Sequence, residues 1–196
     1  MHQNMSKYLF FGFLFLTTVA NGQKVLKYDS TLKIGKVGYR VFCMNRSIEK
    51  NAISIRPIGF KSEGREINLD LKGKVASSEI EDLNNDGFPD LVVYVTEKSG
   101  NTNLFSIASK ENETIEPIIL PDITNDMQMS KGYRGGDDYK LVEGILFRKF
   151  PVYESDTTIK TPTNKVRQIL YRVVRGDQPG IWKFKPFKNF DLSADK

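Results

Sequence analysis

The sequence predicts an all-β fold, an antiparallel β-sandwich or barrel-like single domain, on the basis of three observations. From Tyr39 onward, short segments rich in Val, Ile, Phe and Tyr alternate with clusters of Gly, Asn, Asp, Ser and Pro. These segments recur at intervals of about a dozen residues, a spacing typical of sandwiches and barrels. Outside the N-terminal segment, no window shows the sustained 3.6-residue apolar period of an amphipathic helix.

We expect strands over residues 39–44, 52–58, 65–71, 74–82, 91–97, 103–110, 114–120, 139–153, 166–174 and 181–186. The range 139–153 is long enough for two strands, or for one strand with a bulge at Gly144. Polar and apolar residues alternate in "INLDL" and "RQILYRV", which indicates antiparallel pairing with one buried face. Residues 122–138 carry many turn formers and predict a long surface loop with room for one helical turn. The tail from Asn189 is expected to fray.

Residues 1–22 have the pattern of a secretory signal peptide. Lys7 precedes an apolar run over residues 8–20, and small residues follow before Gln23. Cleavage after Ala20 or after Gly22 satisfies the preference for small residues, and we favour Gly22. The run is shorter than the roughly 20 apolar residues that cross a bilayer, and no cysteine follows it to carry a lipid. We therefore expect residues 23–196 to form one periplasmic or secreted domain with no membrane segment.

The exported chain lacks the residues of several common catalytic sites. The only histidine, His2, lies in the signal segment, so a Ser/His/Asp triad and a histidine zinc site are excluded. Cys43 is the only cysteine, which excludes an internal disulfide and predicts a buried thiol. Loss of Lys7 changes the formal charge from +5 to 5 − 1 = +4, but the basic residues are spread along the chain and do not indicate nucleic-acid binding. The sequence predicts a protein that is not an enzyme.

An acidic stretch, "DLNNDGFPD" over residues 82–90, has the oxygen-ligand order of a calcium loop. Counted from the first aspartate, the predicted ligands at positions one, three, five, seven (a carbonyl) and nine are Asp82, Asn84, Asp86, Phe88 and Asp90. The twelfth position is Val93 in place of a glutamate, so we expect a loop between two strands and not an EF-hand. The ion would stabilise the loop and do no chemistry. The alternative is a metal-free hairpin turn, since Asn and Gly favour such turns.

Several runs together resemble a known family. "EIEDLNNDGFPDLVVYV" (79–95), Ser99-Gly100, "GYRGGDDYKLVEGILFRKFPVY" (132–153), "RQILYRV" and "GIWKFKP" follow in that order. This chain resembles the periplasmic inhibitors of invertebrate-type (I-type) lysozyme from about Gly38 to Lys185. "GYRG", "VEG" and "RKFPVY" are the most specific pieces, because no generic sheet requires them.

The resemblance implies a secreted β protein that blocks a lysozyme-like muramidase by inserting a loop into its active-site cleft. The implied inhibitory loop consists of Ser99, Gly100, Asn101, Thr102 and Asn103, where Gly100 permits a sharp turn and the Ser99 hydroxyl is free to bond a carboxyl group. The chain departs from the family pattern here, because no tyrosine follows Ser-Gly.

A second implied contact comprises Tyr133 and Arg134, residue types that are enriched at interfaces. The alternative is a structural loop in which Arg134 pairs with Asp137 or Asp138. Open sheet edges also leave room for a homodimer. Two further functions remain open from the sequence: a calcium-dependent adhesion or glycan-binding module, and, ranked last, a glycosidase that uses paired carboxylates.

Overall fold

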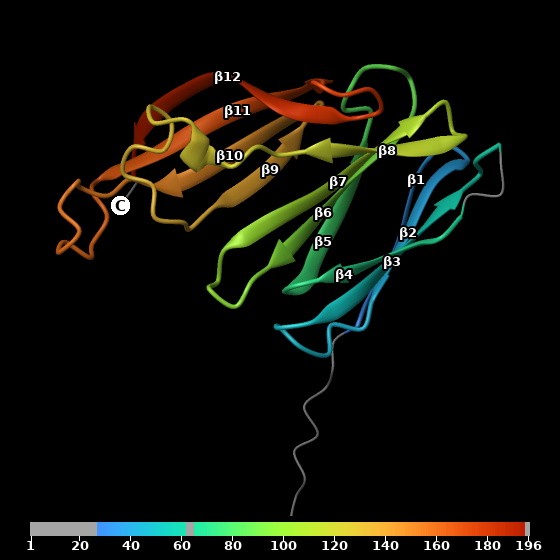
Figure 1. The fold of residues 1–196 in the computed structure, drawn as a ribbon, viewed down its shortest axis with the longest axis horizontal. Helices are drawn as coiled ribbons and strands as arrows, with labels where there is room; N and C mark the ends of the chain where they lie inside the picture. Colours follow the sequence, from blue (N-terminus) through green and yellow to red (C-terminus); the bar gives the residue numbers. More distant parts are fainter. Residues whose placement is uncertain (1–26, 62–64, 195–196) are drawn as a thin grey trace, which may run out of the picture.

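The computed structural model describes residues 27–61 and 65–194, and the predicted signal peptide lies outside them. The described chain is all-β, as predicted, with two sheets and one short 3-10 helix, η1 (Ile123–Asn125) (Figure 1). No helix in these two ranges is long and apolar enough to cross a bilayer.

The first sheet has four antiparallel strands in the order β1-β2-β3-β4. Their bounds are β1 (Tyr28–Ile34), β2 (Val37–Cys43), β3 (Asn51–Ile58) and β4 (Ile67–Leu71).

The second sheet has eight strands in the order β5-β6-β7-β8-β12-β11-β10-β9. Their bounds are β5 (Lys74–Glu81), β6 (Asp90–Thr96), β7 (Thr102–Lys110), β8 (Thr114–Ile119), β9 (Asp138–Val142), β10 (Ile145–Pro151), β11 (Lys165–Arg175) and β12 (Trp182–Ser193). This sheet curves until its two end strands approach each other, and the Gly144 amide in the β9–β10 turn donates to the Glu81 carboxylate of β5. The result is a nearly closed, barrel-like sheet.

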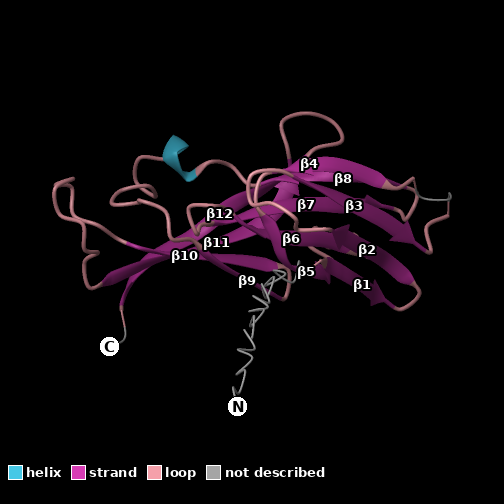
Figure 2. Ribbon diagram, turned by 90° about the horizontal axis from the view of Figure 1, so that it is seen from below, coloured by secondary structure: helices cyan, strands magenta, loops and turns pink. Residues whose placement is uncertain are grey.

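Two hydrophobic cores share the β5–β8 half of the large sheet. Figure 2 shows the four-stranded sheet stacked on this half, while β9 to β12 continue beyond it. The first core lies between the two sheets and includes Tyr39, Val41, Ile53 and Ile55. The second core lies on the concave face of the large sheet and includes Leu146, Phe150, Ile169 and Phe184.

Strand β6 contributes to both cores, because successive side chains of a strand point to opposite faces. Leu91, Val93 and Val95 belong to the first core, and Val92 and Tyr94 belong to the second. All five are at most 5% exposed. The apolar run "LVVYV" is therefore a strand covered on both faces.

Three details differ from the sequence prediction. Strand β1 was not predicted. The tail from Asn189 is not frayed over the described residues, since residues 189–193 pair with residues 165–169 of β11. Strands β8 and β12 pair in parallel, whereas the other described pairs are antiparallel.

Of the two alternatives for the 139–153 range, the two-strand prediction is confirmed. Strands β9 and β10 are joined by a tight turn in which Glu143 and Gly144 both have positive φ, so Gly144 is not a bulge. The predicted buried thiol, Cys43, is 0% exposed in the first core.

The shared strand predicts that the two cores unfold together. Val92→Ala and Val93→Ala remove methyl groups from different cores, and we expect each to lower the free energy of unfolding by about 2 kcal/mol. Urea unfolding should remain a single transition in both variants. Val142→Ala, on the exposed face of end strand β9, is the control and should shift stability by less than about 0.5 kcal/mol. Two separate transitions, each sensitive to one variant, would show that the cores are independent.

Candidate functional site

The turn between β6 and β7 is a short, closed hairpin loop over residues 97–101. The Glu97 amide donates to the Asn101 carbonyl (2.8 Å), and the Gly100 amide donates to the Glu97 carbonyl (3.0 Å). Gly100 has φ +85°, a conformation that glycine adopts without strain, and Ser99 and Gly100 are exposed at the tip. Thr102 and Asn103 lie in β7, so the protruding part is shorter than the predicted loop 99–103.

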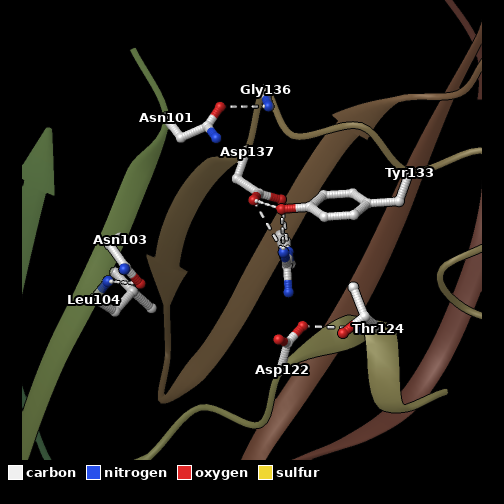
Figure 3. A network of polar contacts seen from close by, with 9 residues as sticks. Asn101, Asn103, Leu104, Asp122, Thr124, Tyr133, Gly136 and Asp137 are labelled. Atoms are coloured by element: carbon white, nitrogen blue, oxygen red, sulfur yellow. Dashed lines mark hydrogen bonds and ion pairs between the residues drawn. The ribbon is translucent and has the colours of Figure 1, made fainter. Parts of the chain in front are cut away.

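The hairpin contacts the glycine-rich segment that follows the long loop. The Gly136 amide donates to Asn101 Oδ1 (2.9 Å), a contact between residues 35 positions apart (Figure 3). Gly135 is buried beside the same side chain, with φ +86°, and a Cβ atom there would lie 2.8 Å from Asn101 Oδ1. A larger residue at 135 would therefore displace Asn101. The structure thus brings together two of the pieces that carry the family resemblance.

A buried ion pair lies beneath this contact. Arg148 of β10 donates from Nε to Asp137 Oδ1 (2.6 Å) and from Nη2 to Asp137 Oδ2 (2.9 Å). Tyr133 joins the pair: its hydroxyl donates to Asp137 Oδ2 (2.5 Å) and accepts from Arg148 Nη2 (3.0 Å). Arg148 is 5% exposed and Asp137 is 9% exposed. Figure 3 shows Tyr133 and Asp137 pointing toward each other.

Aromatic rings surround the guanidinium. Its carbon lies 5.1 Å from the ring centroid of Tyr133, 5.7 Å from that of Tyr139 and 5.8 Å from that of Phe150. Burial lowers the pKa of Arg148, but the hydrogen bonds to Asp137, together with the electrostatic interactions with Tyr139, Asp137 and Tyr171, outweigh it and hold the pKa above its usual value. Burial, with the hydrogen bond to Asp137, raises the pKa of Tyr133 to about 12. At neutral pH the arginine is charged and the phenol keeps its proton.

This network forms one wall of a pocket of about 320 Å³ at the β6–β7 end of the concave face. The β7 side contributes polar groups, and Asn103 Nδ2 donates to Glu97 Oε1 (3.0 Å). The chain after β8 contributes Asp122, which caps η1 by accepting from the Thr124 amide (2.9 Å). The lining residues are Glu97, Asn101, Thr102, Asn103, Leu120, Pro121, Asp122, Ile123, Tyr133, Asp137, Tyr139 and Arg148.

Arg134 does not face this pocket. Its guanidinium donates to the carbonyls of Ile159 (2.6 Å), Glu154 (2.9 Å) and Asp156 (2.9 Å), and it lies over the Tyr153 ring. The expectation that Arg134 pairs with Asp137 or Asp138 is wrong, because Asp137 is bound by Arg148. Arg134 therefore holds the 153–159 loop, and Tyr133 alone of the predicted second contact lines the pocket.

The acidic loop lies at the other end of β6, and most of its side chains bond to the loop's own amides. Asp82 accepts from the Asp86 and Gly87 amides (3.0 and 2.9 Å). Asn84 Oδ1 also accepts from the Asp86 amide (3.0 Å), and Asp86 Oδ1 accepts from the Phe88 amide (3.0 Å). These bonds close a compact turn.

Asp90, the last predicted ligand, points into the protein and is 0% exposed. It accepts from the Leu83 amide (2.9 Å) and from the Ser109 amide of β7 (2.8 Å). Burial raises the pKa of Asp90 to about 7, and the negative charges of Asp86 and Asp82 act in the same direction. Within residues 27–61 and 65–194, no group of three or more His, Cys, Asp or Glu side chains is arranged to hold a metal ion. Calcium binding at this loop stays a prediction.

Sequence reasoning did not identify Arg148, Asp137 or Tyr139 as site residues. A signal was present, because strand alternation in "ILFRKFP" places Arg148 on the same face as Leu146 and Phe150. A charged residue at a core position needs a partner, which marks the position for attention. The partner itself comes from a segment without periodicity, and nothing in the sequence identifies it.

Comparison with protein-family models, with curated proteins and with solved structures finds no match to this chain.

The buried pair predicts a large cost for removing one partner. Asp137→Ala leaves Arg148 charged and buried, and we expect the free energy of unfolding to fall by about 3–5 kcal/mol in urea unfolding. The double variant Asp137→Leu with Arg148→Met should recover much of this loss, because no uncompensated charge remains. Glu66→Ala breaks the exposed pair with Arg56 and should have little effect. Equal losses in Asp137→Ala and Glu66→Ala would contradict the assignment.

Proposed function

We propose that this protein is a secreted or periplasmic inhibitor that blocks the active-site cleft of a lysozyme-like muramidase with its β6–β7 hairpin. The proposal is supported by one observation above others: the Ser99-Gly100 tip and the "GYRGGDD" segment lie side by side, although they are far apart in sequence. In the family that the chain resembles, the Ser-Gly loop is the inhibitory element, and the second segment is the possible second contact in this chain. The two segments have to be adjacent if they form a single contact surface.

The hairpin has the mechanical properties that such a role needs. Its loop is closed by backbone hydrogen bonds and braced by Asn101, so little conformational entropy is lost when it docks. The exposed Ser99 hydroxyl both donates and accepts hydrogen bonds, which suits a cleft whose catalytic groups are carboxyls. In the family pattern a tyrosine lies close after Ser-Gly. In this chain Asn101 follows Ser-Gly, and it accepts a hydrogen bond from the Gly136 amide within the protein. Ser99 is therefore the main candidate for contact with the enzyme.

We also propose that the 82–90 loop takes up calcium as a structural ion. The donor set supports this proposal: three carboxylates and an amide lie within nine residues, and each oxygen that accepts one amide hydrogen bond keeps a second lone pair. The charges of Asp86 and Asp82 both oppose a negative charge on Asp90. A cation would relieve that repulsion.

Substitutions at the hairpin tip should weaken inhibition. Ser99→Trp places a large side chain at the tip, and we expect the inhibition constant against an invertebrate-type lysozyme to rise about tenfold or more in a peptidoglycan-clearing assay. The matched control is Glu111→Trp in the β7–β8 turn, at the opposite end of β7, which should inhibit like the unmodified protein. Undiminished clearing by several lysozyme types in excess unmodified protein would refute the proposed function.

Calcium should raise the melting temperature and release or absorb heat in a calorimetric titration. We expect a weak dissociation constant of roughly 10⁻⁴ to 10⁻³ M, as for other extracellular sites. Asp86→Ala should abolish both signals, and Asp70→Ala, at an exposed position of strand β4, should preserve them. A titration of the unmodified protein that shows neither heat nor a thermal shift would exclude the ion.

A further inference from the structure

The pocket beside the hairpin has a buried arginine at its floor, which inhibition by the hairpin does not require. Arg148 lines the pocket although only 5% of it is exposed to solvent. Its Nε and Nη2 groups hold Asp137 and Tyr133, and the two N–H groups of Nη1 take no part in this network. Burial raises the pKa of Tyr171, and the charge of Arg148 and a hydrogen bond between its guanidinium and the Tyr171 hydroxyl oppose this effect. Four of the five guanidinium N–H groups are thus engaged by Asp137, Tyr133 and Tyr171, and the pocket floor presents the remaining donor, held rigidly in place.

The rim presents the opposite chemistry. Glu97 accepts from Asn103 Nδ2, and Asp122 accepts from both the amide and the side chain of Thr124. The carboxylate lone pairs that these bonds leave free are acceptors beside the pocket. Asn101 uses its Oδ1 on Gly136, and its Nδ2 group has no hydrogen bond to the described residues. Figure 3 shows Asn101 and Asn103 on the β7 side and Asp122 below them, with Tyr133 across from β7.

The charges and donors of the lining disfavour two classes of ligand. Asp137 compensates Arg148, so Glu97 and Asp122 leave the lining with an excess of negative charge, which disfavours an anion. An ammonium group pairs with the rim carboxylates, but it has only donors and offers no acceptor to the guanidinium N–H at the floor. A neutral molecule with several hydroxyl groups satisfies both ends, because each hydroxyl accepts from the floor and donates to the rim.

The size and the polar lining of the pocket agree with this class. Tyr133 and Tyr139 line the pocket, but its accessible surface is mostly polar, so hydrogen bonds and not stacking on the rings would hold the ligand. The volume of about 320 Å³ is near the lower end of the range for small-molecule sites, which suits one ring and not an extended chain.

We propose that this pocket binds one neutral sugar ring, at the end of a glycan or as a free monosaccharide. Arg148 and Asn101 donate to ring substituents, and Glu97 and Asp122 accept from hydroxyl groups. The site uses none of the acidic-loop residues 82–90, so binding does not depend on calcium.

The test is a titration of the full mature chain, labelled with ¹⁵N, with glucose, galactose, mannose, N-acetylglucosamine and chitotriose in separate experiments. We expect at least one of them to give saturable shifts of the Arg148 Nε–H and Asn101 Nδ2 signals, unchanged by chelator. Asn101→Ala and Asp122→Ala should each weaken that binding about tenfold, as expected for loss of a ligand hydrogen bond. Asn68→Ala on β4 is the matched control and should bind normally.

Two results would overturn the proposal: no saturable shift with any of the five sugars, or shifts of these signals with sodium sulfate or lysine but with no sugar. The Ser99→Trp variant separates this inference from the proposed inhibition, because Ser99 does not line the pocket. Loss of inhibition with retained sugar binding in that variant supports two distinct activities at one end of the molecule. Loss of the sugar shifts in that variant would contradict a site built from the pocket residues alone.

Discussion

Burial of strand β6 on both faces is the constraint on which the rest of the structure depends. A strand that is apolar on both sides must be covered twice, once by the four-stranded sheet and once by the concave half of the large sheet. The four-stranded sheet is stable with only four strands because its inner face packs against Leu91, Val93 and Val95. The large sheet is curved because β9 to β12 must bend back to cover Val92 and Tyr94.

The two sequence motifs with a functional interpretation lie at the two ends of this strand. At its start, Asp90 binds the amides of Leu83 and Ser109, and the Tyr39 hydroxyl donates to the Pro89 carbonyl (2.9 Å). The acidic loop is therefore tied to β7 and to the four-stranded sheet whether or not an ion is present. At the end of β6, the 97–101 hairpin loop continues directly from the same buried strand. Strand β6 therefore supports both the acidic loop at its start and the hairpin at its end.

Strand periodicity predicted most of the fold, and it failed where pairing depends on residues distant in sequence. The runs "LVVYV" and "RQILYRV" carry their own signal, since their burial follows from alternation. Strand β1, "YDSTLKI", is half polar, with only Tyr28 and Leu32 packed against the first core, so its signal is weak. The end of β12, "KNFDLS", is polar and exposed and forms a strand because β11 is long enough to pair with it.

The candidate site was predictable in part for the same reason. The hairpin is local, and Gly100 marks its turn, so the sequence located it. The pocket depends on a contact between Asn101 and Gly136 and on the Arg148–Asp137 pair, and neither has a periodic signature. For Arg134 the sequence left an interface and a structural role open. Its three hydrogen bonds to carbonyls show that it organises the neighbouring loop, with partners that the sequence did not indicate.

The Arg148–Asp137 pair is a poor choice for stability alone, because desolvation of two charges offsets much of their attraction, and apolar residues of similar size often stabilise a core as well or better. Its effect here is geometric. Arg148 fixes Asp137, the chain next to Asp137 places the Gly136 amide, and that amide holds Asn101 at the base of the hairpin. A series of directional bonds thus runs from the concave face to the exposed tip, through a pocket that an apolar core would have filled. Directional bonds, unlike apolar contacts, set the orientation of a surface, which is what recognition of another molecule requires.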